Sequence, residues 1–136
     1  MQEMFCFQCQ QTAHNTGCDG KAGVCGKKAD TANYQDEVIG ALIGLAQAVQ
    51  AGTATDRTDE LMLKGLFTTI TNVNFNNETI LQIKNDIEKE KAAVSTTHFA
   101  DYDMAELWWA GEDVRSLKSL ILFGLKGMAA YAYHAR

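Results

Sequence analysis

The chain is organised around one stretch near its start, Met4-Phe5-Cys6-Phe7-Gln8-Cys9, which continues through Gly17-Cys18 to Gly23-Val24-Cys25-Gly26-Lys27. All four cysteines of the 136 residues lie in this stretch, with the spacing C-x2-C-x8-C-x6-C. Glycines at positions 17, 20, 23 and 26 surround the last two cysteines. No cysteine occurs beyond residue 30, so we expect any reaction centre of this chain to lie in the first 28 residues.

Four thiolates can hold an iron–sulfur cluster or a tetrahedral zinc ion, or they can pair into two disulfides. The C-x2-C pair is a chelating turn, whereas the longer arms must wrap around something larger than a single ion. Zinc usually joins two short knuckles, and this chain has one. Disulfides suit small secreted domains, and no signal peptide is evident. The glycines let backbone N–H groups approach a negatively charged cluster. The residues therefore favour a cluster over zinc or disulfides.

Further motifs extend this pattern along the chain. They are Gln10-Gln11-Thr12-Ala13, Ala32-Asn33-Tyr34-Gln35-Asp36, Gly65-Leu66-Phe67-Thr68-Thr69-Ile70-Thr71-Asn72-Val73-Asn74, Glu112-Asp113-Val114-Arg115-Ser116-Leu117, Gly124-Leu125-Lys126-Gly127-Met128-Ala129-Ala130 and Tyr131-Ala132-Tyr133-His134-Ala135. Together with the cysteine stretch, they closely resemble the opening of the hybrid cluster proteins (the prismane or hydroxylamine reductase family). The resemblance touches nearly the whole chain, in order.

The resemblance implies a cofactor and its ligands. In that family four N-terminal cysteines hold a cubane 4Fe–4S cluster, or in some members a 2Fe–2S cluster, so Cys6, Cys9, Cys18 and Cys25 would be the ligands. The x6 arm is one residue longer than in cubane-type members, which leaves the nuclearity open and 4Fe–4S favoured. Family members are several times longer, and later cysteines, a histidine and glutamates hold their catalytic hybrid cluster. This chain resembles the first domain alone, so we assign it no catalytic residue and do not carry over the oxidoreductase activity.

The composition argues against some classes of binding partner. The formal net charge is −5 and no basic run appears, which argues against nucleic acid. No apolar run reaches the ~18–20 residues of a membrane span. Clustered thiols without a targeting segment predict the cytoplasm, in a cell that lives without oxygen.

The helical pattern predicts a single all-α domain over residues 1–136. A cluster-binding loop covers 1–28, and an antiparallel bundle of three to four helices covers 30–136. Apolar periodicity predicts helices over about 30–51, 56–73, 77–94 and 112–136. Residues 95–111 are weakly patterned, and strand signals are absent. The cysteine loop is expected to dock at one end of the bundle.

Three features of these helices carry expectations. Gly40 and Gly44 lie on one side of the first helix, which favours close approach of another backbone. The charges over residues 84–91 predict a solvated face. The last helix carries an apolar stripe, namely Val114, Leu117, Ile121, Leu125 and Met128, supported by Leu120 and Tyr131.

We expect no ligand role for the histidines, aromatic residues and lysines of the chain. His14 is expected to be a loop residue, and His98 and His134 to be incidental. Phe5 and Phe7 could shield the cluster from water. The lysines at 21, 27 and 28 are expected on the surface. Trp108 and Trp109 either both pack in the core, which is the expected outcome, or one of them faces a partner.

The sequence and the resemblance lead to three hypotheses for the function of the chain. The favoured one is an electron-transfer domain that relays electrons between a redox partner protein and a catalytic centre on another domain or chain. The second is a structural or interaction module stapled by a cluster or zinc. The third is an excised first domain of a hydroxylamine reductase, which would expose an apolar helical face and form homo-oligomers through it.

Overall fold

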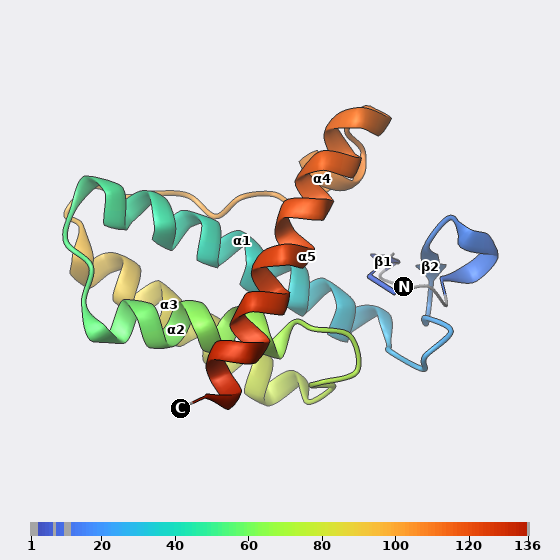
Figure 1. The fold of residues 1–136 in the computed structure, drawn as a ribbon, viewed down its shortest axis with the longest axis horizontal. Coiled ribbons are helices and arrows are strands. Elements are labelled where there is room, and N and C mark those ends of the chain that lie inside the picture. The colour runs from blue at the N-terminus through green and yellow to red at the C-terminus, as the bar shows by residue number, and fades with distance from the viewer. Residues whose placement is uncertain (1–2, 7, 10–11, 136) are drawn as a thin grey trace.

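The computed structural model describes residues 3–6, 8–9 and 12–135. The helices of this part are α1 (Ala29–Ala51), α2 (Asp56–Thr68), α3 (Asn77–Val94), α4 (Ala105–Trp108) and α5 (Glu112–His134). The cysteine segment contains an antiparallel pair of short strands, β1 (Met4–Cys6) and β2 (Cys18–Gly20), and a 3₁₀ turn (Ala13–Asn15). The predicted, mainly helical architecture is confirmed, and the cysteine segment lies at one end of it (Figure 1).

Helices α1, α2 and α3 lie side by side, and each runs in the direction opposite to the one before it (Figure 1). The core of the bundle is aliphatic, because the apolar residues of α1 and α3 recur at helical spacing and point inward. Its fully buried members include Val38, Leu45, Leu61, Ile80 and Ile87. This core holds α1 rigidly, and α1 in turn supports the cysteine segment that precedes it.

The two glycines of α1 let an extended segment lie directly on the helix. A Cβ atom on Gly40 would stand 2.3 Å from the carbonyl oxygen of Tyr102, and one on Gly44 would stand 2.9 Å from that of Ala100. The Tyr102 amide also donates to the Gly40 carbonyl over 3.1 Å. The expected close approach of another backbone is confirmed.

The helix boundaries agree with the prediction except at the end of α2. The side chain of Asn76 caps α3 by accepting from the Thr79 amide, at 3.0 Å. We expected α2 to continue to residue 73, but it ends at Thr68. Asn72 has a left-handed backbone with φ 62°, which a right-handed helix cannot contain.

The expectation that the chain contains no strands was wrong. The pairing of β1 with β2 matches Met4 to Gly20, Phe5 to Asp19 and Cys6 to Cys18. Strands of three residues are too short to show an alternating pattern in the sequence. Their pairing instead depends on the intervening loop, so the periodicity of side chains gave no sign of it.

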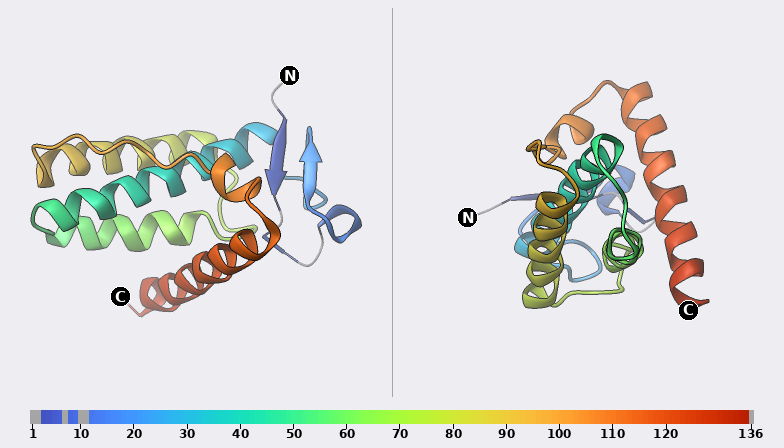
Figure 2. Two further views of the ribbon diagram at one scale, coloured as in Figure 1. Left: turned by 90° about the horizontal axis from the view of Figure 1, so that it is seen from above. Right: turned by 90° about the vertical axis from the view of Figure 1, so that its left-hand side faces the viewer.

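Helix α5 lies obliquely across the outside of the bundle and packs on α2 (Figures 1 and 2). Tyr133 stacks on Phe67 with 4.3 Å between ring centroids. The buried side of α5 carries Ser119, Lys126 and Ala129. Its apolar stripe faces away from the bundle, with Leu117 64%, Ile121 64% and Tyr131 84% exposed.

The charged face of α3 is less solvated than expected. Lys91 is buried, and its ammonium group forms ion pairs with Glu88 and with Asp101 of the extended segment. The lysine thereby fastens residues 100–101 along the bundle. Among the described residues, none of the helices combines the length and the apolar character that a membrane crossing requires.

Candidate metal centre

The β1–β2 pair brings the first and third cysteines together. Cys6 and Cys18 are direct partners in the antiparallel register. The turn into β2 depends on Gly17, whose φ is 126°, and a Cβ at that position would stand 2.7 Å from the Phe5 ring. Only glycine avoids both the strained backbone and this overlap.

A glycine turn brings the fourth cysteine to the third. The Gly23 amide donates to the Lys27 carbonyl at 2.8 Å, and the Gly26 amide donates to the Gly23 carbonyl at 2.9 Å. A Cβ on Gly23 would stand 3.7 Å from the sulfur of Cys18 and 3.7 Å from the sulfur of Cys25. Both thiols therefore face the same glycine.

All four cysteines line one small pocket, together with Met4, Thr12, Gly23, Val24, Lys27 and Thr71. The thiols are free rather than joined in disulfides. Burial raises the pKa of Cys6 above its usual value. The Gln8 backbone hydrogen bond and the Lys27 charge favour the thiolate and oppose this shift only in part. A metal that replaces the proton would relieve this cost.

The described side chains do not form a ready site for a single ion. Within residues 3–6, 8–9 and 12–135, no three histidine, cysteine or acidic side chains come close enough together to bind one metal ion. A cluster has separate iron atoms at its corners, so its thiolate ligands stand further apart than those of one tetrahedral zinc. The structure thus brings the four cysteines to one pocket without the geometry of a single-ion site among the described residues.

Donors and cations near the sulfurs add to this fit. The Val24 amide points at the Cys18 sulfur over 3.5 Å, as backbone donors do around cluster sulfurs. Lys27 is 2% exposed and Lys126 is 4% exposed, and both are close enough to Cys6 for their charges to interact with it. These residues fit the negative charge that four thiolates would give a bound cluster.

Lys27 corrects the expectation of a surface lysine. Its ammonium group donates to Gln35 Oε1 over 2.7 Å and lies 5.8 Å from the centroid of the Phe75 ring. Gln35 in turn donates to the Asn74 carbonyl over 2.8 Å. The lysine thus ties the last cysteine turn to α1 and to the loop before α3, whereas Lys21 and Lys28 are exposed as expected.

The aromatic residues next to β1 form a second layer around the loop. The Phe5 ring lies 5.8 Å from that of Trp108 and 5.4 Å from that of Trp109, between ring centroids. Trp108 is buried and Trp109 is 73% exposed, so core packing of both rings, the expected outcome, was wrong. Phe7 lies outside the described residues, so its expected shielding role stays a prediction.

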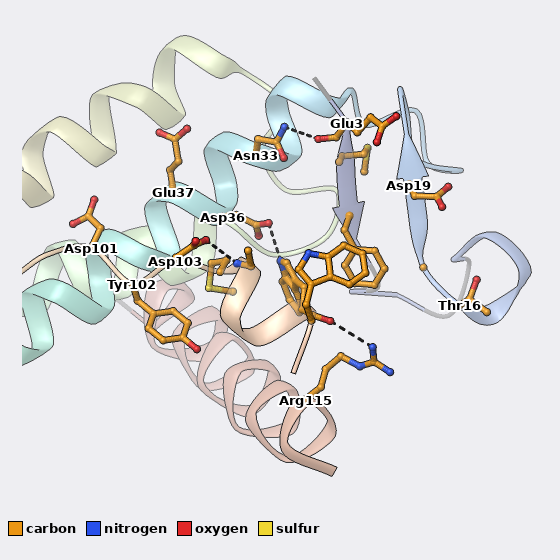
Figure 3. Close-up of a pocket in the computed structure, with 17 residues that line it drawn as sticks. Glu3, Thr16, Asp19, Asn33, Asp36, Glu37, Asp101, Tyr102, Asp103 and Arg115 are labelled. Atoms are coloured by element: carbon orange, nitrogen blue, oxygen red, sulfur yellow. Dashed lines mark hydrogen bonds between the residues drawn. The ribbon is translucent and has the colours of Figure 1, made fainter. Parts of the chain in front are cut away.

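Asp36 of α1 and the short helix α4 enclose the same region from the other side. The Trp108 indole N–H donates to Asp36 Oδ2 at 2.9 Å, and Arg115 reaches the Trp108 carbonyl at 3.4 Å (Figure 3). These residues line a groove of about 970 Å³ beside β1. Burial raises the pKa of Asp36 to about 6, against the opposing effects of the Trp108 hydrogen bond and the positive charges of Lys126 and Lys27.

His14 is a loop residue, as expected. His14 is exposed in the 3₁₀ turn, with a φ of 53°, and His98 and His134 are exposed far along the chain. The sequence reading missed Asp36 and Lys126. Both residues belong to motifs that resemble the family, but neither was singled out. Lys126 lies opposite the apolar stripe of its helix, where a lysine would ordinarily be solvated.

Comparison with known proteins gives the chain a family. A family model described as "Prismane/CO dehydrogenase family" matches residues 4–136. Hydroxylamine reductases are similar to the chain: that of Caldanaerobacter subterraneus subsp. tengcongensis is 41% identical over 98% of the chain and 30% of its own length. That of Desulfovibrio desulfuricans is 42% identical over 97% of the chain and 29% of its own length.

The chain spans about 30% of the length of these relatives and corresponds to their N-terminal part. The first of these alignments covers 164 positions, which is more than the 136 residues of the chain, so that relative carries additional residues inside the matched region. The family model covers residues 4–136, and the first relative is 41% identical over 98% of the chain. The chain therefore belongs to the prismane/CO dehydrogenase family.

Proposed function

We propose that the chain is an iron–sulfur electron-transfer domain in which Cys6, Cys9, Cys18 and Cys25 hold the cluster. The observation that carries the proposal is that the four thiols, from two strands and two turns, line one pocket. Prismane-family membership supports a cluster as the occupant, and we favour 4Fe–4S over 2Fe–2S or zinc. When bound, the cluster would accept and release one electron at a time.

The residues around the pocket would orient the ligands and limit access of water. The β1–β2 register holds Cys6 opposite Cys18, and the turn at Gly23 holds Cys25 beside Cys18. Met4 lines the pocket beside the cysteines, whereas Phe5 and Trp108 pack together in the neighbouring groove on the other side of β1.

The relay would pass electrons to a catalytic centre on a further domain or chain. The exposed apolar side of α5 and the exposed Trp109 are the surfaces that we assign to that contact. The hydroxylamine reductase activity named for the relatives would belong to the longer assembly. A reducing compartment such as the cytoplasm suits the four free thiols.

Protein-film voltammetry of the anaerobically purified chain tests the relay. The expected result is a reversible one-electron wave that is lost in Cys18→Ser, the variant that removes the most buried of the four thiols. Thr16→Ser, in the same loop but away from the sulfurs, is the control. A metal-loaded chain with no reversible wave would instead favour the structural staple.

A further inference from the structure

A buried lysine of α5 reaches the cysteine loop from outside it. Lys126 is 4% exposed. Its ammonium group donates to Gln8 Oε1 at 3.0 Å and to the Thr69 carbonyl at 3.2 Å. Both acceptors are uncharged, and the ion pairs formed among the described residues do not include Lys126.

Such a lysine needs an explanation, because removing an ammonium group from water costs free energy unless an opposite charge compensates it. Burial lowers the pKa of Lys126 to about 8. The charges that act on it come from three elements: Asp36 of α1 and Cys6 of β1 favour the ammonium form, and Lys27 of the loop disfavours it. Asp36 itself is directed to the Trp108 indole rather than to the lysine.

The position of Lys126 connects it to two parts of the cysteine pocket. Gln8, which accepts its hydrogen bond, stands between Cys6 and Cys9, and the Gln8 amide favours the Cys6 thiolate. Thr69 lies two residues before Thr71, a lining residue of the pocket. The ammonium group therefore sits behind the C-x2-C turn, on the α2 and α5 side of it.

We propose that Lys126 is a positioning residue that compensates the negative charge of the bound cluster and raises its reduction potential. The inference rests on the proposed function. Four thiolates leave an iron–sulfur cluster with net negative charge, and one-electron reduction adds to it. A positive charge held in a region of low dielectric stabilises the reduced form more than the oxidised form. The step transfers one electron from the reductant and requires no proton or bond change.

The test compares four proteins: the wild type, Lys126→Gln, Lys126→Arg and Lys118→Gln. Glutamine keeps a donor for Gln8 and Thr69 but removes the charge, and arginine keeps the charge. Lys118, on the same helix, is exposed and contacts Tyr102, so its replacement changes the net charge equally without touching the loop. Iron and acid-labile sulfide are counted in each, and the potential is measured by dithionite titration followed by EPR.

The expected result is that Lys126→Gln keeps its iron and sulfide but binds the electron roughly tenfold more weakly, which for one electron is about 59 mV lower in potential. Lys126→Arg and Lys118→Gln should stay close to the wild type. An unshifted potential in a fully loaded Lys126→Gln would overturn the inference while leaving the proposed function intact. If Lys126→Gln does not bind a cluster, the same lowering of the potential is expected in Lys126→Met. A shift in Lys118→Gln equal to that in Lys126→Gln would also overturn the inference. A wild type without cluster would overturn the proposed function itself.

Discussion

Among single residues, Asp36 has a titration that can be followed directly. Burial raises its pKa from 3.8 to about 6, and Trp108 reports on it through the indole hydrogen bond. Because the folded pKa is above the unfolded one, the protonated carboxyl favours the folded state. This contribution is full below about pH 4 and is lost as the pH rises through about 6, for a total of about 3 kcal/mol.

We therefore expect wild type, measured relative to Asp36→Asn, to lose up to about 3 kcal/mol of unfolding free energy between pH 4 and pH 7. Urea unfolding of the metal-free, reduced protein at intervals of pH measures this difference. Trp108 fluorescence of the wild type should change with a midpoint near pH 6. Asp56→Asn, at an exposed position, is the control. Parallel stability curves for wild type and Asp36→Asn would contradict the burial of the carboxyl.

The cysteines could be predicted as site residues from the sequence, and the buried lysines could not. The four cysteines were identifiable as candidate metal ligands because thiols at this spacing are typical of metal or cluster sites. The buried positions of Lys27 and Lys126 were not, because lysine is ordinarily solvated and its burial depends on acceptors far away in the sequence. Gln35 and Thr69, which accept from the two ammonium groups, carry no local sign of that role.

Among the elements, α1 depends on its contact with the segment over residues 99–103. Gly40→Ala would place a Cβ 2.3 Å from the Tyr102 carbonyl oxygen, so that segment must move away. We expect a loss of about 1–3 kcal/mol in unfolding free energy, measured by urea unfolding.

Gly124→Ala is the matched control, because beyond the neighbouring turns of its own helix no atom of the described residues lies within 4 Å of the position that its Cβ would take. In the interior of α5, alanine should stabilise the helix by up to about 1 kcal/mol. Both substitutions replace glycine by alanine in a helix, but they should change the unfolding free energy in opposite directions. If both stabilise the protein, the extended segment does not rest on α1 as described.

Helices were predictable here, and the short strands were not. The helices of the bundle repeat apolar residues over three or more turns, and Asn76 marks the start of α3 with a side-chain cap. The β1–β2 pair and the four-residue helix α4 are too short for a periodic signal. Tertiary contacts, such as the ring of Phe5 against Trp108, hold these short elements in place.

For the whole molecule, the outward face of α5 is the apolar surface that we expect to govern association. Its apolar residues are exposed over five turns, whereas a soluble surface rarely carries such a continuous patch. We expect the chain alone to self-associate through this face, with a mass by light scattering that rises with concentration. Leu117→Glu combined with Ile121→Glu should give a monomer with little change in unfolding free energy, since both side chains are exposed.

Asn85→Glu combined with Gln47→Glu is the control for the added charge, because both positions are exposed on the bundle and away from α5. This control should associate as the wild type does. A wild type that stays monomeric at all concentrations would show that the α5 face does not serve as an interface between copies.

The direction of the α5 stripe could not be read from its own sequence. Periodicity shows that a helix has an apolar face but not which neighbour covers it. In this chain, Ser119 and Lys126 are on the buried side of α5 and Leu122 packs against the core. Leu117, Leu120 and Leu125 are exposed. Relatives more than three times as long have further chain that could cover such a face.

The central claim is that Cys6, Cys9, Cys18 and Cys25 hold a redox-active iron–sulfur cluster. The most direct test is to purify the chain without oxygen and to count iron and acid-labile sulfide, with visible and EPR spectra before and after dithionite. We predict about four irons and four sulfides per chain, and absorption that bleaches on reduction as an EPR signal appears. Zinc with no labile sulfide, or iron that persists when Cys18 is replaced by serine, would contradict the account.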